Sequence, residues 1–135
     1  HLDSARSPIL SIAGISPEYK DGELLEFEVN ANEEVYLWIY QVKDDRADLF
    51  FPHEKYLPEI VLKSNETFKF PPLGIPVRAR LDEKFTALEV QNLVFIAAKR
   101  KETWEKTMDL NELVERYSAQ KGQKDIKVIK VAITR

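Results

Sequence analysis

Residues 35–42 read Val-Tyr-Leu-Trp-Ile-Tyr-Gln-Val, a pattern that favours a β-strand over a helix. Successive side chains of a strand point to opposite faces. One face of this strand would be aliphatic and the other aromatic, comprising Val35, Leu37 and Ile39 against Tyr36, Trp38 and Tyr40. Because both faces are apolar, we expect a central strand that is covered on both sides.

The preceding segment, residues 23–30, alternates in the manner of a strand with one face in water. Leu25, Phe27 and Val29 would face the core, and the intervening positions are mostly polar. The short polar turn between the two segments predicts that they form a hairpin. Further short apolar segments lie before and after these two, at residues 9–12, 49–51, 60–62, 68–70, 77–81, 93–98 and 126–133. Many short strands separated by turns predict a mainly β protein, an immunoglobulin-like antiparallel β-sandwich.

One segment has the period of a helix. Asp109 and Glu112 have the spacing of a capping box, and Gly122 is placed to stop a helix. Between them runs one apolar stripe, formed by Leu110, Leu113, Val114 and Tyr117. These signals predict a helix over residues 109–121 and a final strand over residues 126–133. The helix must bury its stripe, so we expect it to pack on a sheet face.

The composition is that of an ordinary globular protein. Hydrophobic residues make up 44 % of the 135 residues and charged residues 32 %, so the chain lacks the low-apolar, high-charge signature of disorder. We expect a single domain over residues 1–135. The net charge is −3, and Lys and Arg are interspersed with Asp and Glu. Because there is no basic field, no nucleic-acid partner is expected.

The ends of the chain carry few signals. No apolar run reaches the roughly 18 residues needed to cross a bilayer, so no transmembrane segment is expected. The start, His-Leu-Asp-Ser at residues 1–4, has no initiator Met and none of the parts of a signal peptide. We therefore expect residues 1–8 to be a linker or a vector-derived remnant, and the chain to be an excised or processed piece of a longer protein.

Familiar catalytic sets are hard to assemble from these residues. The histidines are His1 and His53, and His1 falls in the expected linker. A Ser-His-Asp triad would need His53 with Ser64 or Ser118, and no nucleophile-elbow spacing supports it. The absence of cysteine removes thiolate nucleophiles and thiolate metal sites. We expect a protein that is not an enzyme.

Other site patterns are also weak. Residues 44–48 carry some of the oxygens of a calcium loop but lack its glycine. The four glycines are isolated from one another, which does not suit a phosphate-binding loop. The adjacent acidic pairs fall in expected turns, namely Glu33-Glu34, Asp44-Asp45 and Asp82-Glu83. No metal or cofactor is expected.

Aromatic side chains supply the candidate binding surface. Tyr36, Trp38 and Tyr40 share one strand face and could stack on sugar rings or receive a peptide. The alternative, which we favour, is that the predicted helix covers this face and makes it core. Phe51 and His53, on either side of Pro52, are either the end of a core strand or part of an exposed recognition loop. These five residues are the candidate ligand or partner surface.

Several short motifs carry a family resemblance. They are Tyr-Lys-Asp-Gly-Glu at 19–23, Val-Tyr-Leu-Trp-Ile-Tyr at 35–40, Leu-Phe-Phe-Pro at 49–52, Phe-Pro at 70–71 and Phe-Ile-Ala-Ala at 95–98. In this order they resemble the bacterial family catalogued as domain of unknown function 4384, over roughly residues 9–100. His53 stands where the family usually has Asn after Phe-Pro, and the loop over residues 81–91 is longer and more polar than in the family.

The resemblance implies a β-sandwich that serves as an accessory domain of bacterial envelope and multi-domain proteins, and it implies no active site. Together with the residues, it predicts a non-enzymatic domain of the bacterial cell envelope, periplasmic or secreted, that binds a protein partner or supports assembly. The alternative is a carbohydrate- or peptidoglycan-binding module that uses Tyr36, Trp38 and Tyr40, with a glycan as ligand. A hydrolase built on His53 is the weakest alternative.

Overall fold

The computed structural model describes residues 7–55, 57–85 and 87–135. The predicted linker, residues 1–8, therefore lies outside the described residues except for its last two positions. In chain order the elements are β1 (Leu10–Ala13), β2 (Glu18–Lys20), β3 (Phe27–Ala31), β4 (Val35–Lys43), β5 (Arg46–Phe51), β6 (Val61–Leu62), β7 (Thr67–Phe70), β8 (Leu88–Ala98), β9 (Thr107–Asp109), α1 (Leu110–Ala119) and β10 (Lys124–Thr134).

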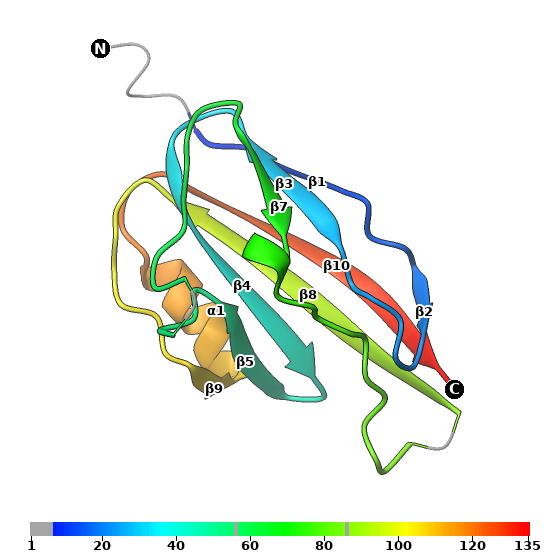
Figure 1. Cartoon of the computed structure of the whole chain (residues 1–135). Helices are drawn as coiled ribbons and strands as arrows, with labels where there is room; N and C mark the ends of the chain where they lie inside the picture. The colour runs from blue at the N-terminus through cyan, green and yellow to red at the C-terminus, as the bar shows by residue number, and fades with distance from the viewer. Residues whose placement is uncertain (1–6, 56, 86) are drawn as a thin grey trace.

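These strands form two sheets that pack face to face (Figure 1). The smaller sheet has the order β1-β3-β7. The larger one has the order β2-β10-β8-β4-β5-β9, with β6 also paired to β4. All pairings are antiparallel except that β2 runs parallel to β10. The predicted β-sandwich with one helix is confirmed, and so is the central position of residues 35–42, which form β4 between β8 and β5.

The predicted hairpin between residues 23–30 and 35–42 is wrong. β3 pairs with β1 and β7 in the smaller sheet, whereas β4 belongs to the larger sheet. The turn between them carries the chain across the sandwich. The physical reason lies in the two strands themselves: β3 has one polar face and suits a sheet that is open to water on one side, while β4 needs cover on both faces.

The core between the sheets is rich in aromatic rings. Phe27 of β3 stacks on Phe70 of β7 with ring centroids 4.3 Å apart, and Phe95 of β8 meets Phe27 edge-on at 5.4 Å. The aliphatic face of β4 lies in the same cluster. Each sheet therefore presents one apolar face to the other, which is what the period of two in these strands predicts.

A second core lies on the outer face of the larger sheet. It joins Trp38 and Tyr40 of β4 to Leu113 of α1 and to Trp104, which precedes β9. Figure 1 shows α1 lying behind β4 and β5, on the side away from the smaller sheet. The predicted packing of the helix on a sheet face is confirmed. Within the described ranges, no helix is long and apolar enough to cross a membrane.

The helix begins with the predicted capping box. The Asp109 side chain accepts a 2.8 Å hydrogen bond from the Glu112 backbone N–H, and the Glu112 side chain accepts a 3.0 Å bond from the Asp109 N–H. At the other end, the Lys124 ammonium donates to the backbone carbonyl of Tyr117 at 2.7 Å, which also accepts from the Gln120 backbone N–H. The predicted stripe is only partly buried, because Val114 is 57 % exposed while Leu113 is buried.

Candidate functional site

The aromatic face of β4 is interior rather than surface. Trp38 is 6 % exposed and Tyr40 is fully buried. Trp104 covers both, with ring centroids 5.5 Å from Trp38 and 6.0 Å from Tyr40. These two rings cannot stack on a sugar in this arrangement, and the favoured interpretation of this face as core describes them. Tyr36 is half-buried and lies at the rim of the cluster, 6.3 Å from Trp38.

The other two candidates are separated from this face and from each other. Phe51 is buried in the core between the sheets, edge-on to Phe70 at 5.1 Å. His53 is half-buried in the loop after β5, where its Nδ1 accepts a 3.2 Å hydrogen bond from the backbone N–H of Lys55. Ser64, one of the hydroxyls considered for a triad, instead donates to the backbone carbonyl of Asn32. The five predicted residues therefore do not form one surface.

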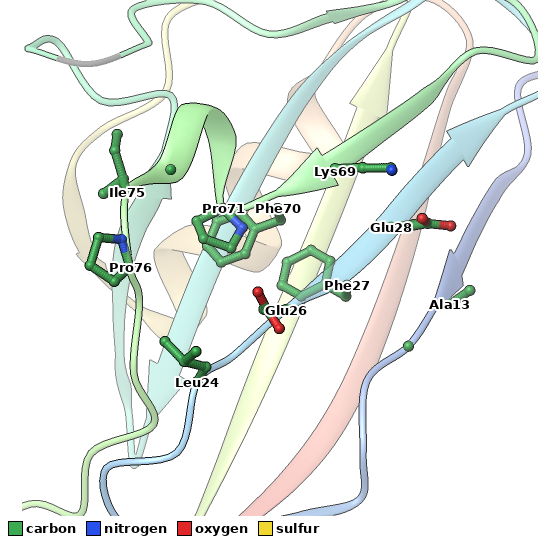
Figure 2. A pocket seen from close by; sticks show the side chains of 12 residues that line it. Ala13, Leu24, Glu26, Phe27, Glu28, Lys69, Phe70, Pro71, Ile75 and Pro76 are labelled. Carbon is green, nitrogen blue, oxygen red and sulfur yellow. The ribbon is translucent and has the colours of Figure 1, made fainter.

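A cleft of about 660 Å³ opens at one end of the smaller sheet. It is lined by Ala13, Gly14, Leu24, Glu26, Phe27, Glu28, Lys69, Phe70, Pro71, Gly74, Ile75 and Pro76. Figure 2 shows Ile75 and Pro76 on one side and Ala13 and Glu28 on the other, with the start of β3 and the end of β7 between them. The cleft lies where these chain segments diverge.

Proline and glycine explain why the segments diverge here. Phe27 and Phe70 are the last register pair of β3 and β7. Pro71 and Pro72 have no N–H to donate to a ladder, so β7 ends, and the chain makes a 3-10 turn over Pro72–Gly74. On the opposite rim, Gly14 has φ +92° and passes so close to β3 that a Cβ there would lie 3.4 Å from the Phe27 Cα.

Charge and apolar surface meet at this cleft. Leu24 is 43 % exposed, and Pro76 is also exposed. Glu26, just before β3, and Glu28, on β3, are both exposed, and Lys69 lies opposite Glu28 in the register. None of these three charged side chains forms an ion pair with another described residue. The cleft thus combines apolar walls with two carboxylates, neither of which forms an ion pair with a described residue.

The sequence showed the two segments that line this cleft, but not that they lie close together in space. Glu26 and Glu28 were visible as the wet face of a predicted strand, and the loop over residues 71–76 was visible as a stiff, proline-rich stretch. More than forty positions separate the two segments, and only the pairing of β3 with β7 brings them together. No group of three or more metal-ligating side chains occurs in the part of the chain that the structure describes.

A family model described as "Domain of unknown function (DUF4384)" matches residues 18–100. The match runs from β2 to just beyond β8, and it includes every residue that lines the cleft except Ala13 and Gly14. Trp104, α1 and β10 lie beyond it. No curated protein matches the chain.

Proposed function

The chain belongs to the family of domains of unknown function 4384, and we propose that it is a non-enzymatic module that binds a partner protein, whose extended segment lies in the cleft beside β3. The observation that carries this proposal is the combination of an open apolar cleft with the unpaired carboxylates of Glu26 and Glu28. The predicted location in the bacterial envelope remains part of the proposal.

The shape of the cleft suits a peptide segment. Its volume is within the range in which proteins hold ligands, and it is open along the start of β3 rather than closed around a small molecule. An extended segment bound along residues 24–28 would cover about 15 Å of strand. The exposed part of Leu24 and the face of Pro76 would then leave water, which supplies the main favourable term in binding.

The charges point to a basic segment. Glu26 and Glu28 are two residues apart where the chain enters β3, so their Cα atoms are separated by at most about 7 Å. An extended partner has the same repeat, and lysine or arginine at alternating positions would face both carboxylates. Lys69, beside Glu28, would disfavour a third basic residue there. Rim ion pairs of this kind mainly set orientation and association rate, and the apolar contacts hold the complex.

The test is a selection with a library of random peptides displayed on phage, using the folded domain as bait. We expect the selected peptides to combine basic residues with aliphatic or proline residues. Made synthetically, they should bind the Glu26→Gln/Glu28→Gln variant about tenfold more weakly, and their affinity for the wild type should fall with added salt. Leu24→Ser should weaken binding, because it removes apolar surface from the wall of the cleft without changing its charge.

The matched control is Glu83→Gln, which removes an exposed carboxylate away from the cleft and should leave affinity unchanged. Selection of no peptide, or of peptides whose affinity is the same for wild type and the Glu26→Gln/Glu28→Gln variant, would contradict the proposal.

A further inference from the structure

The outer face of the larger sheet is only half covered. Among the described residues, seven large apolar side chains are strongly exposed, and five of them lie on this face, three of them beside the groove at α1 and two toward the far end of β8. They are Leu88 and Val90 of β8, Leu110 and Val114 of α1, and Val128 of β10, which is 59 % exposed. A sheet face open to water normally carries polar side chains at these positions. The clustering therefore marks a surface that a partner covers.

A groove of about 340 Å³ runs between the helix and the open half of the sheet. One wall is the flank of α1 that carries Leu110 and Val114, and the floor includes Val94 of β8 and Val128 of β10. The helix lies over β4 and β5, while β8 and β10 extend beyond it (Figure 1). The face therefore has two levels. The helix α1 covers the half formed by β4 and β5, and the uncovered half, formed by β8 and β10, is a flat apolar strip beside it.

This face, with a raised helix beside an open strip, is complementary in shape to a second copy of itself. When two such faces meet across a twofold axis that lies in the interface, the helix of each copy can occupy the open strip of the other. The contact is then isologous, with the α1 flank of one copy against β8 and β10 of its partner, twice. The exposed apolar side chains that line the groove, Leu110, Val114 and Val128, would be buried in both copies. The two α1 helices would then form one layer between the larger sheets of the two copies.

The charged side chains near the groove also favour a second copy of this chain as its occupant. Glu115 is exposed on α1 next to Val114, and Lys130 is exposed on the outer face of β10, one outward position after Val128. Neither forms an ion pair with another described residue. α1 therefore carries an exposed acidic side chain and the strip an exposed basic one, and seating each helix on the partner's strip would bring Glu115 of one copy to Lys130 of the other.

We propose that this face is the interface of a homodimer, in which α1 of each copy lies in the groove between α1 and β10 of the other. The proposal is independent of the cleft beside β3, which lies on the opposite side of the sandwich and stays open in the dimer. The occupant to which it commits is a second copy of this chain.

Sedimentation velocity of the purified chain, over concentrations from about 1 µM to about 1 mM, tests the proposal directly. We expect a monomer–dimer equilibrium that Val128→Glu abolishes. Val128 is mostly exposed in the monomer, so this variant should keep the circular dichroism spectrum and the melting temperature of the dissociated wild type. A wild type that stays monomeric throughout would overturn the proposal. A dimer unaffected by Val128→Glu would overturn it as well.

Charge reversal tests the reciprocal seating. Glu115→Lys or Lys130→Glu alone should weaken the dimer about tenfold, because each places like charges together in both symmetry-related contacts. The double variant Glu115→Lys/Lys130→Glu should regain most of the lost affinity, because the pair is restored with reversed signs. Glu66→Lys, a reversal in the turn before β7, should leave the dimer unchanged. A double variant as weak as the sum of its single variants would overturn this arrangement.

Discussion

The indole N–H of Trp104 donates a 3.1 Å hydrogen bond to the side-chain oxygen of Gln120, and both side chains are buried. The Gln120 amide in turn donates to the Arg100 backbone carbonyl at 3.1 Å, and the Arg116 guanidinium lies 4.7 Å from the Trp104 ring centroid. The segment between β8 and β9 has little regular structure, yet these contacts fasten it to α1. Trp104 is thereby held as the cover over Trp38.

Gln120→Leu is expected to lower the free energy of unfolding by about 1–3 kcal/mol, because it leaves the buried indole N–H without an acceptor. Urea denaturation measures the effect, with Lys121→Ala as the control, an exposed neighbour that should change stability by no more than about 0.5 kcal/mol. Combined with Trp104→Phe, the Gln120 change should cost less than it does alone, since the donor is gone. Strict additivity of the two changes would contradict the contact.

Leu113→Ala and Val114→Ala form a matched pair on adjacent positions of α1. Leu113 is buried against the sheet, so its truncation should cost about 2–5 kcal/mol. Val114 points into the open groove, and its truncation should cost no more than about 0.5 kcal/mol. Chemical denaturation should be run at a concentration below that of self-association, so that the groove stays open. Equal losses for the two variants would place the helix in a different rotation from the one described.

Alkaline pH should destabilise the fold through Tyr40. Burial of the hydroxyl, which donates to the Glu105 backbone carbonyl, raises the pKa of Tyr40 far above its ordinary value, and the Glu105 charge raises it further. Because the folded pKa lies above the unfolded one, the contribution to stability is complete below about pH 10 and is lost as the pH rises above it. Unfolding free energies measured across this range should fall less steeply in Tyr40→Phe.

The control for Tyr40 is Tyr117→Phe. Burial, followed by the charge of Asp125, also raises the pKa of Tyr117, but this side chain is only half-buried. Its removal should therefore change the alkaline slope less than that of Tyr40. Ultraviolet difference spectra of the wild type and Tyr40→Phe should differ by one tyrosine that ionises only when the protein unfolds, and titration of Tyr40 in the folded state would contradict its burial.

The tryptophan emission spectrum should not change when glycans are added. Trp38 and Trp104 are both buried, so the emission should lie at short wavelength and acrylamide should quench it weakly. Chito-oligosaccharides and peptidoglycan fragments should leave the spectrum unchanged. Trp104→Phe isolates the Trp38 signal and serves as the control. A saturable change on adding a glycan would mean that the cover over β4 opens, and it would revive the carbohydrate-binding alternative.

The sequence was informative where one strand or helix sets its own environment. Both faces of residues 35–42 are apolar, and this alone predicted a central, doubly covered strand. The capping box at Asp109 uses only contacts within one turn, so its spacing was sufficient to locate the start of α1. The sequence failed where two strands could pair in more than one way: β3 and β4 are adjacent in the chain, yet they belong to different sheets.

The five residues predicted as a binding surface show the same limit. Their aromatic character was evident, but burial depends on what lies above them. Trp38 and Tyr40 are covered largely by Trp104. The segment that carries Trp104 has no periodic pattern from which this packing could be predicted. Phe51 was left between core and loop, and it packs on Phe70, nineteen positions later, because the two sheets meet there.

By itself, then, the sequence determined a β-sandwich with one capped helix, because alternation and helical period are local properties that each element carries along its own length. The tertiary structure alone decided the partition of the strands between two sheets, the burial of the β4 aromatics, the cleft beside β3 and the half-open face beside α1. Each of these depends on contacts between residues far apart in the chain. Several strand pairings and packing arrangements are compatible with the local pattern, and only the folded structure determines which side chains are exposed to solvent.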